Sequence, residues 1–354
     1  MKSSEEMARN VFERRDQYHK RREEREERRE AFCRRASAIT MAVVCVGMLS
    51  ITCVLAATIN IGDVFRSIFT IRQNESLSES QSAYIDNHAA AIGESVTQDG
   101  VTVTIEGAIT DGTMAYILVD IVAPDGYFID SLPLGFNIEF EKLKLAGQEN
   151  DHISSVSMGC IPLSDNDGKE NTASMLIQYN IYQFLGSNFS FGDGKARTLQ
   201  LQNLFYYEDK FPYSLSTVAE GEWIYEFAFT TVDDKEVELL NHPVAGSYSQ
   251  ISGSKVNATI NSILMKGLSA TVYYTLAPNE VQEAGDFGTI KVVLKDGNTV
   301  NAYPEKAGQI SRIENGTLIP NSAGHYCTYV FEAPVSYEDV EAIYIGETEI
   351  EINN

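Results

Sequence analysis

The sequence predicts a mainly β protein in which two tandem β-sandwich domains follow one N-terminal transmembrane helix, itself preceded by a short charged cytoplasmic helix. Three observations carry this prediction. Residues 36–62 form an uncharged run of about membrane length, strand-like alternation dominates the chain from Val101 onward, and one alternating pattern occurs twice. With 354 residues, the chain has room for two domains and these attachments.

The predicted cytoplasmic tail, residues 1–36, is a charged helix that no proline or glycine interrupts. It carries 12 Lys and Arg against 9 Asp and Glu, a net charge of +3; the whole chain carries −23, so the residues after the tail carry −26. Met7, Val11 and Tyr18 lie on one helical face, with Phe12 beside them. Two interpretations stay open: a solvated spacer, or a docking helix that binds a partner through these four residues.

Residues 37–61 form the predicted transmembrane helix. A helix rises about 1.5 Å per residue, so about 20 mostly apolar residues cross a bilayer, and this segment supplies them without a charge. Arginines precede it and Asp63 follows it, so the positive-inside tendency places the N-terminus in the cytoplasm and the C-terminal ectodomain outside the cell membrane. A cleaved signal peptide is the alternative, with Val54–Ala56 as its cleavage site, but the long charged segment before the run favours a single uncleaved anchor.

The predicted ectodomain is strongly acidic and poor in cysteine. Its charge repels phosphate backbones, so nucleic acid is a poor partner for it. Cys160 and Cys327 are the cysteines outside the apolar run and its flank, and they fall in different predicted domains, which argues against a framework of disulfides. The fold therefore depends on its core, for which 18 Tyr and 16 Phe supply large side chains.

Residues 62–94 form the predicted juxtamembrane segment and linker. A short apolar stripe, interpreted as a continuation of the anchor helix at the membrane interface, consists of Val64, Phe65, Ile68, Phe69 and Ile71. The polar, serine-rich residues 74–82 that follow are typical of a linker. One or two helical turns are expected at residues 84–92, before the first strand.

Residues 95–240 form the predicted first sandwich, which has enlarged loops, and residues 241–354 form the second. Apolar and polar residues alternate with period two in both. Strands of the first domain are predicted at Val101–Glu106, Met114–Val122, Asn137–Leu145, Ser174–Gln183, Arg197–Tyr207 and Glu222–Thr231. The second domain is predicted to contain a strand at residues 290–295 and to end in a hairpin of Ala342–Ile345 and Glu349–Ile352 around Gly346.

The alternating pattern at residues 101–124 returns at residues 256–278. Five residues recur 155 positions later, namely Val101, Thr104, Ile105, Gly112 and Ala115 as Val256, Thr259, Ile260, Gly267 and Ala270. Residues 221–227 likewise resemble residues 324–330, now 103 positions later. These matches predict a duplicated sandwich whose second copy is shorter by 52 residues, with the extra length of the first copy between residues 124 and 197. Alternation alone is the competing explanation.

The loops at residues 147–152 and 164–171 are the predicted binding region, because loops on a rigid sandwich commonly carry recognition. Asp165, Asp167 and Glu170 are weak calcium candidates, but their spacing departs from that of a calcium loop and favours a plain turn. The five histidines show no ligand spacing, and no catalytic motif is present. The sequence therefore predicts a protein that is not an enzyme, with no catalytic residue, no cofactor and no other metal site.

Three features resemble a known group of bacterial proteins: the charged tail with its single anchor, the segment DGVTVTIEGAITDG at residues 99–112, and the strand GEWIYEFAF at residues 221–229. They resemble bacterial single-pass membrane proteins whose ectodomain is an Ig-like domain of unknown function followed by a second Ig-like domain. The resemblance implies two tandem Ig-like β-sandwich domains. Such proteins are often described as anti-sigma factors, which implies a cytoplasmic sigma factor as partner of the tail. The tail departs from well-defined anti-sigma proteins in that His19 has no companion cysteines for a zinc motif.

The sequence thus predicts a membrane-anchored extracytoplasmic sensor or regulatory protein, anti-sigma-factor-like, whose ectodomain binds an envelope or extracellular ligand and relays that state inward. The alternative is a structural or adhesive cell-surface protein with no signalling role. A third hypothesis is a calcium- or glycan-binding module that uses the loops of the first domain.

Overall fold

The structure is a computed structural model, and it describes residues 60–130, 132–140, 153–163, 169–183, 190–207, 215–232, 236–240, 242–249, 255–278, 287–314, 317–350 and 352. The predicted tail and nearly all of the predicted transmembrane helix, up to residue 59, lie outside these ranges. Among the helices that the structure describes, none has the length and apolar character of a membrane span. Most of the described elements are strands, so the prediction of a mainly β chain is confirmed.

Two helices come first, α2 at Ile61–Gln73 and α3 at Glu79–His88. The Asn60 side chain caps α2 by accepting a hydrogen bond from the Gly62 backbone N–H (3.2 Å). Ser78 caps α3 through a reciprocal capping box with Gln81. The serine-rich segment interpreted as a linker, residues 74–82, therefore consists of the capped junction between the two helices and the first residues of α3.

The apolar stripe of α2 is buried inside the protein. Phe65 and Phe69 have no exposed surface, and the Phe69 ring lies 5.7 Å from the Tyr116 ring, edge to face. Ile71, by contrast, is 76% exposed. The expectation that this stripe lies at the membrane interface is wrong, because an amphipathic helix shields its apolar face on whichever apolar surface is nearest, and here that surface is a β-sheet.

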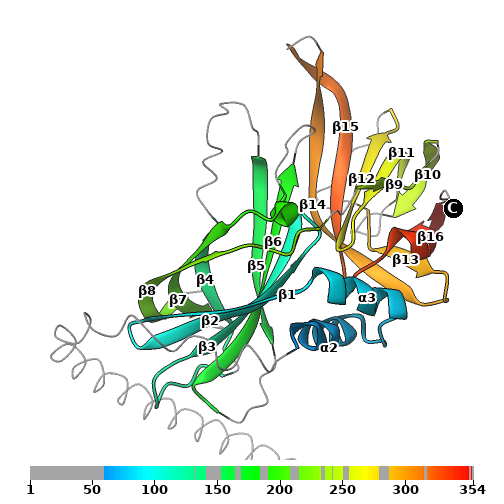
Figure 1. Ribbon diagram of the computed structural model, residues 1–354. Helices are drawn as coiled ribbons and strands as arrows, with labels where there is room; N and C mark the ends of the chain where they lie inside the picture. Colours follow the sequence, from blue (N-terminus) through cyan, green and yellow to red (C-terminus); the bar gives the residue numbers. More distant parts are fainter. Residues whose placement is uncertain are drawn as a thin grey trace, which may run out of the picture.

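The first β unit consists of two antiparallel sheets that face each other across a core (Figure 1). One sheet has the order β1-β2-β3-β6-β5, with bounds Ala90–Gln98, Val101–Thr110, Met114–Val122, Thr172–Gln183 and Ile153–Leu163. The other has the order β4-β7-β8, with bounds Leu134–Phe140, Arg197–Tyr207 and Leu215–Phe227. Trp223 and Tyr225 join the sheets, since they donate hydrogen bonds across the core to the carbonyls of Val101 (3.2 Å) and Val103 (2.7 Å).

The strands of the second β unit form one continuous antiparallel sheet. Its order is β10-β11-β12-β15-β14-β13-β16-β17, with bounds Val244–Ser249, Lys255–Met265, Ser269–Leu276, Thr317–Phe331, Thr299–Glu314, Ile290–Leu294, Val340–Ile345 and Thr348–Ile350. The short strand β9, Val237–Glu238, pairs with β11. Two 3-10 turns complete the described elements, Phe191–Asp193 and Tyr337–Asp339.

The two units repeat one topology, as the sequence predicts. The order β1-β2-β3-β6-β5 returns as β10-β11-β12-β15-β14, and β4-β7-β8 returns as β13-β16-β17. The β-bulge of the first hairpin, between Ile105 and Gly107, has its counterpart 155 positions later, between Ile260 and Ser262. A bulge at the same place in both hairpins cannot come from alternation alone, so the first sequence match marks a structural repeat.

The second sequence match is wrong. Ala115 of β3 lies opposite Tyr179 of β6, and Ala270 of β12 lies opposite Tyr329 of β15, so β15 corresponds to β6, at an offset of 150. The segment at 221–227 lies in β8, whose counterpart is β17. Much of the extra length of the first unit therefore lies in β7 and β8, with 11 and 13 residues against 6 and 3 in β16 and β17. Any strand with one buried face alternates, which produced the false match.

The helices and both units share one core. Five side chains on the outer face of the first sheet belong to the same hydrophobic cluster as α2, α3 and the interior of the second unit: Ile109, Met114, Tyr116, Leu118 and Leu176. In Figure 1, α2 and α3 lie beneath the junction of the two units. The segment 62–94 thus packs into the fold, β1 begins within it at Ala90, and β9 precedes residue 240 yet pairs with the second unit.

Candidate functional site at the seam between the two units

Two equivalent turns meet where the two units contact each other. We call this region the seam; it consists of α2, α3, the hairpins β2–β3 and β11–β12, and the neighbouring part of β14. In the first turn the Asp111 N–H donates to the Met114 carbonyl (3.1 Å), and in the second the Lys266 N–H donates to the Ser269 carbonyl (2.8 Å). The two turns are 155 positions apart, like the hairpins that carry them. The seam therefore joins the same part of both repeats.

Asp111 ties these turns together. Its side chain is completely buried, and Oδ1 accepts hydrogen bonds from the Met114 N–H (2.7 Å) and from both the N–H and hydroxyl of Thr113 (3.0 and 3.1 Å). Oδ2 accepts from the second unit, from the Leu268 N–H (3.2 Å) and the Ser269 hydroxyl (2.7 Å). A buried carboxylate is costly unless hydrogen bonds replace its water, and here five do so.

The contact of Asp111 with the second unit was not predicted from the sequence. The available signal was the break in the repeat, because the equivalent position holds Lys266. When only one copy of a repeat has an acidic residue at a turn, and the rest of the pattern matches, that residue is expected to make a contact that the other copy does not make.

On each unit, one helix packs closely against a glycine. At Gly107 of β2, an added Cβ would lie 2.4 Å from Cγ1 of Ile61 and 2.6 Å from the Ala90 carbonyl oxygen. At Gly267 of the second turn, it would lie 2.1 Å from the Tyr84 hydroxyl. The start of α2 therefore packs directly on the first unit, and α3 packs directly on the second.

Gln81 strengthens the contact between α3 and the second unit. Its buried side-chain amide donates a hydrogen bond to the Pro334 carbonyl (3.0 Å). The two helices also contact each other, so α2 and α3 bridge the two units.

A group of polar side chains lies at the C-terminal end of α2. The Arg72 guanidinium stands over the Tyr116 ring, with Cζ 4.9 Å from the ring centroid, and it also approaches the Phe69 ring (6.0 Å). Burial raises the pKa of the Tyr116 phenol to about 12, although the charge of Arg72 acts in the opposite direction. The phenol therefore stays protonated at neutral pH.

Three buried polar atoms of this region have no hydrogen-bond partner among the residues that the structure describes: Arg72 Nη1, Tyr116 OH and Asn180 Nδ2. We call Arg72, Tyr116 and Asn180 the donor cluster. Leaving a buried donor unsatisfied costs about 1–3 kcal/mol, so three in one region are exceptional for a folded protein.

The donor cluster lies on the outer face of the first sheet, next to the second unit. Tyr116 pairs with Gln178 and Met114 with Asn180, so Tyr116 and Asn180 are diagonal neighbours on β3 and β6. Ser157 of β5 pairs with Asn180 and donates a hydrogen bond to the Glu305 carboxylate of β14. The cluster is thus surrounded by α2, the first sheet and a strand of the second unit.

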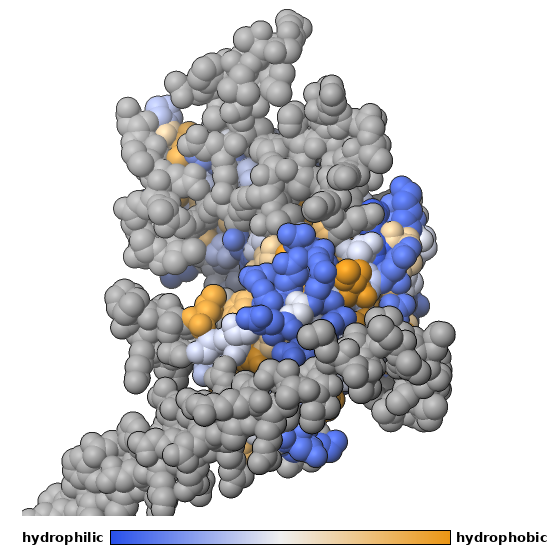
Figure 2. Space-filling model, turned by 90° about the vertical axis from the view of Figure 1, so that its left-hand side faces the viewer, coloured by the Kyte–Doolittle hydropathy of each residue, from blue (hydrophilic) through white to orange (hydrophobic). Residues whose placement is uncertain are grey.

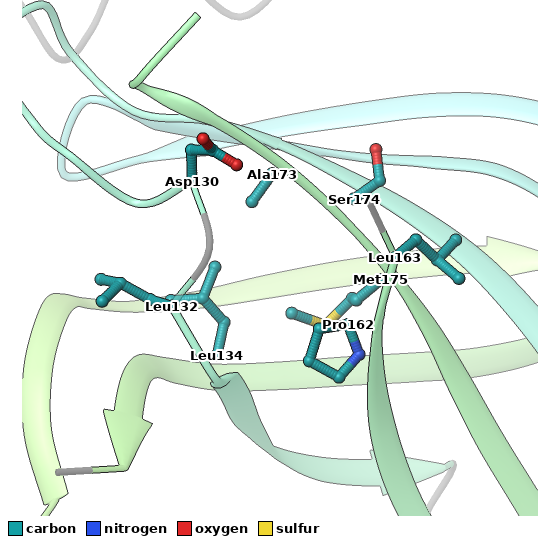
Figure 3. Close-up of a pocket in the computed structure, with 8 residues that line it drawn as sticks. All are labelled: Asp130, Leu132, Leu134, Pro162, Leu163, Ala173, Ser174 and Met175. Atoms are coloured by element: carbon teal, nitrogen blue, oxygen red, sulfur yellow. The ribbon is translucent and has the colours of Figure 1, made fainter. Parts of the chain in front are cut away.

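The described cavities lie elsewhere. One of about 20 Å³ has room for a single water, and in Figure 3 Leu132 and Leu134 lie on one side of it and Pro162 and Met175 on the other. A groove of about 550 Å³ between the start of α3 and the β13–β14 turn is lined by Ser78, Glu79, Ser80, Ala83, Leu294, Lys295, Asp296 and Asp339. Its mixture of three carboxylates, one lysine and small hydroxyls defines no reaction chemistry.

The outer face of the β4-β7-β8 sheet is exposed and acidic. Glu139 of β4 and Glu222 and Glu226 of β8 are exposed, and Ile224 among them is 50% exposed. Figure 2 looks from the side on which β7 and β8 lie in Figure 1, and the described surface there is mainly hydrophilic, with small hydrophobic areas. A polyanion would be repelled from this face.

Most sequence-predicted site residues lie outside the described residues. These are Met7, Val11, Phe12 and Tyr18 of the tail, and the calcium candidates Asp165 and Asp167. Glu170 is described and exposed; its backbone carbonyl accepts hydrogen bonds from the N–H groups of Ile129 (2.8 Å) and Asp130 (3.2 Å). Within the described ranges, no three His, Cys, Asp or Glu side chains are grouped as metal ligands.

Comparison with known proteins gives a partial match. Residues 28–122 match a family described as a domain of unknown function (DUF4179), a stretch that includes α2, α3 and β1 to β3 and hence Asp111, Arg72 and Tyr116. No curated protein matches the chain. A solved structure described as the crystal structure of the conserved domain protein from Bacillus anthracis is similar, with 12% identity and a TM-score of 0.44, covering 80% of this chain and 83% of that one.

The family match supports one part of the resemblance, a domain of unknown function within residues 28–122. It does not bear on an Ig-like identity of the units or on an anti-sigma function.

Proposed function

We propose that the chain is a single-pass cell-membrane protein whose two extracytoplasmic β units sense an envelope or extracellular ligand and relay its presence through α2 to the cytoplasmic tail. One observation carries the proposal: α2, which directly follows the predicted membrane span, is buried against the first unit and contacts α3, which packs on the second unit. Phe65 and Phe69 are fully covered, and Ile61 rests on Gly107. A shift of one unit against the other would therefore move the helix that leads to the membrane.

A passive tether would not need this packing. A flexible serine-rich linker, which the sequence alone suggested at residues 74–82, would let the ectodomain move without any effect on the anchor. Instead, Asn60 and Ser78 cap two ordered helices, and Gln81 fixes the second of them to Pro334. This arrangement favours a relay over the structural or adhesive alternative.

On the resemblance, the partner of the tail is a cytoplasmic sigma factor, held through Met7, Val11, Phe12 and Tyr18, and each β unit is an Ig-like sandwich. The chain performs no catalysis in this proposal. A pull-down with residues 1–36 checks the tail separately; recovery of no sigma factor removes the anti-sigma part and leaves the sensing part to the test below.

The relay is tested by uncoupling α2 from the membrane span. A flexible Gly-Ser segment inserted between Asn60 and Ile61 should abolish the difference in transcript profile between cells with and without the protein, at unchanged surface amount. The matched control carries the same segment at the exposed turn Asp296-Gly297 and should behave as wild type. A transcript profile that survives the first insertion, or does not depend on the protein at all, would overturn the relay and leave the adhesive alternative.

A further inference from the structure

We propose that the donor cluster, Arg72, Tyr116 and Asn180, is a binding site for a small ligand that carries a carboxylate, located at the seam between the two units. This inference deepens the proposed function, because it names the chemistry of the ligand. It rests on that function for the consequence of binding, but not for the binding itself.

The three atoms, which have no hydrogen-bond partner within the described ranges, share one chemical property. The Arg72 guanidinium and the Asn180 amide nitrogen are donors only, and the buried Tyr116 hydroxyl is protonated at neutral pH, as any tyrosine is, and can donate as well. Three donors in one place suit a group that only accepts. A carboxylate accepts through two oxygens and several lone pairs, and its pairing with a guanidinium is among the strongest polar contacts in proteins.

The charge in this region also favours an anion. Among the described residues, no carboxylate forms an ion pair with Arg72, although the chain has 50 Asp and Glu against 27 Lys and Arg. Glu305, whose charge acts on Tyr116, accepts a hydrogen bond from Ser157 instead. On the same helix, Arg66 pairs with both Asp63 and Asp86. Among the described residues, the Arg72 guanidinium therefore lies without a counter-ion at the contact between α2 and the first unit.

The position of the cluster connects binding to the seam. Arg72 belongs to α2, Tyr116 and Asn180 belong to the first unit, and Glu305 of the second unit lies alongside. Asp111, by contrast, is already fully hydrogen-bonded between the units. A ligand that contacts Arg72 and the first sheet together binds only while α2 is docked, so it shifts the population toward the docked state.

The site is tested with acetate as the probe, on the full chain in detergent micelles at neutral pH. Thermal unfolding is followed in sodium acetate and in sodium chloride of equal ionic strength. Acetate should raise the melting temperature of the wild type in a concentration-dependent way. Arg72→Gln should weaken the apparent acetate affinity ~10- to 100-fold, the usual worth of a charge-assisted hydrogen bond. Arg66→Gln is the matched control and should keep the wild-type response.

Tyr116→Phe provides a variant that is expected to fold, since it removes a buried hydroxyl that has no hydrogen-bond partner in the described part of the chain. It should be at least as stable as the wild type in chloride and should respond less to acetate. Equal melting temperatures in acetate and chloride for the wild type would mean that the donors hold only water, and would overturn the proposal. If Glu305→Gln binds acetate and the wild type does not, the Glu305 carboxylate occupies the donors in the wild type. That result would also overturn the proposal. Neither readout involves signalling, so failure here is distinct from failure of the relay.

Discussion

Replacing Asp111 with asparagine tests whether one buried carboxylate couples the two β units. Asparagine has nearly the same shape, but one of its two polar atoms is an amide nitrogen that cannot accept. The carboxylate accepts three hydrogen bonds within its own turn and two from Leu268 and Ser269 of the second unit. The amide group therefore faces at least two donors whichever way it is turned.

The magnitude follows from that count. Each buried donor left without an acceptor costs about 1–3 kcal/mol, so two such donors in Asp111→Asn should lower the free energy of unfolding by about 2–6 kcal/mol. Asp296→Asn is the matched control, because Asp296 also accepts from a turn N–H, that of Asn298 (2.9 Å), but is exposed. Its effect should stay within about 0.5 kcal/mol.

The assay is urea unfolding of the full chain, followed by two probes. Trp223 is the single tryptophan and is buried in the first unit, so its fluorescence reports on that unit, whereas far-ultraviolet circular dichroism reports on both. The two transitions should coincide in the wild type and separate in Asp111→Asn. A loss below about 1 kcal/mol with coincident transitions would refute the reasoning, because the five hydrogen bonds would then be replaceable by water.

Further predictions concern close contacts and pH. Gly267→Ala should destabilise the chain by about 1–3 kcal/mol, because the new Cβ meets the Tyr84 hydroxyl at 2.1 Å, whereas Gly159→Ala, which meets no atom within 4 Å, should be nearly neutral in the same urea titration. Gly107→Ala should be as costly, since Ile61 and a backbone carbonyl both block the new methyl group; an unchanged midpoint would contradict this packing. The pKa of Tyr116 is raised from 10 to about 12 in the folded state, so its contribution of roughly 2–3 kcal/mol is complete below pH 10 and is lost as the pH rises through 12. Tyr116→Phe should therefore flatten the fall in melting temperature above pH 10, and an identical fall would disprove the assignment.

Local patterns predicted much of the β structure. The predicted bounds of β3 and β7 coincide with the observed ones, and the terminal hairpin around Gly346 is present as β16 and β17. These strands each have one strictly buried face or a continuous apolar run, which is what periodicity detects. The strand β1, AAIGESVTQ at 90–98, was missed because none of its side chains is fully buried. A glycine-containing edge strand leaves little trace in the sequence.

The donor cluster could not be predicted, for a different reason. Arg72, Tyr116 and Asn180 stand far apart in the sequence and belong to a helix and two strands that meet only in the folded chain. Nothing in the residues themselves distinguishes Arg66, which has two carboxylate partners, from Arg72, which has none among the described residues. Charge pairing across a fold is decided by tertiary geometry.

The sequence by itself determined the class of structure, the charge asymmetry and the repeat at an offset of 155, because alternation, composition and spacing are local quantities. Only the tertiary structure decided what covers the apolar face of α2 and which strand of the second unit corresponds to β6. It also decided that Asp111 spans two units. Each of these depends on which surfaces come into contact, and a buried face looks the same in the sequence whether a membrane, a helix or another sheet covers it.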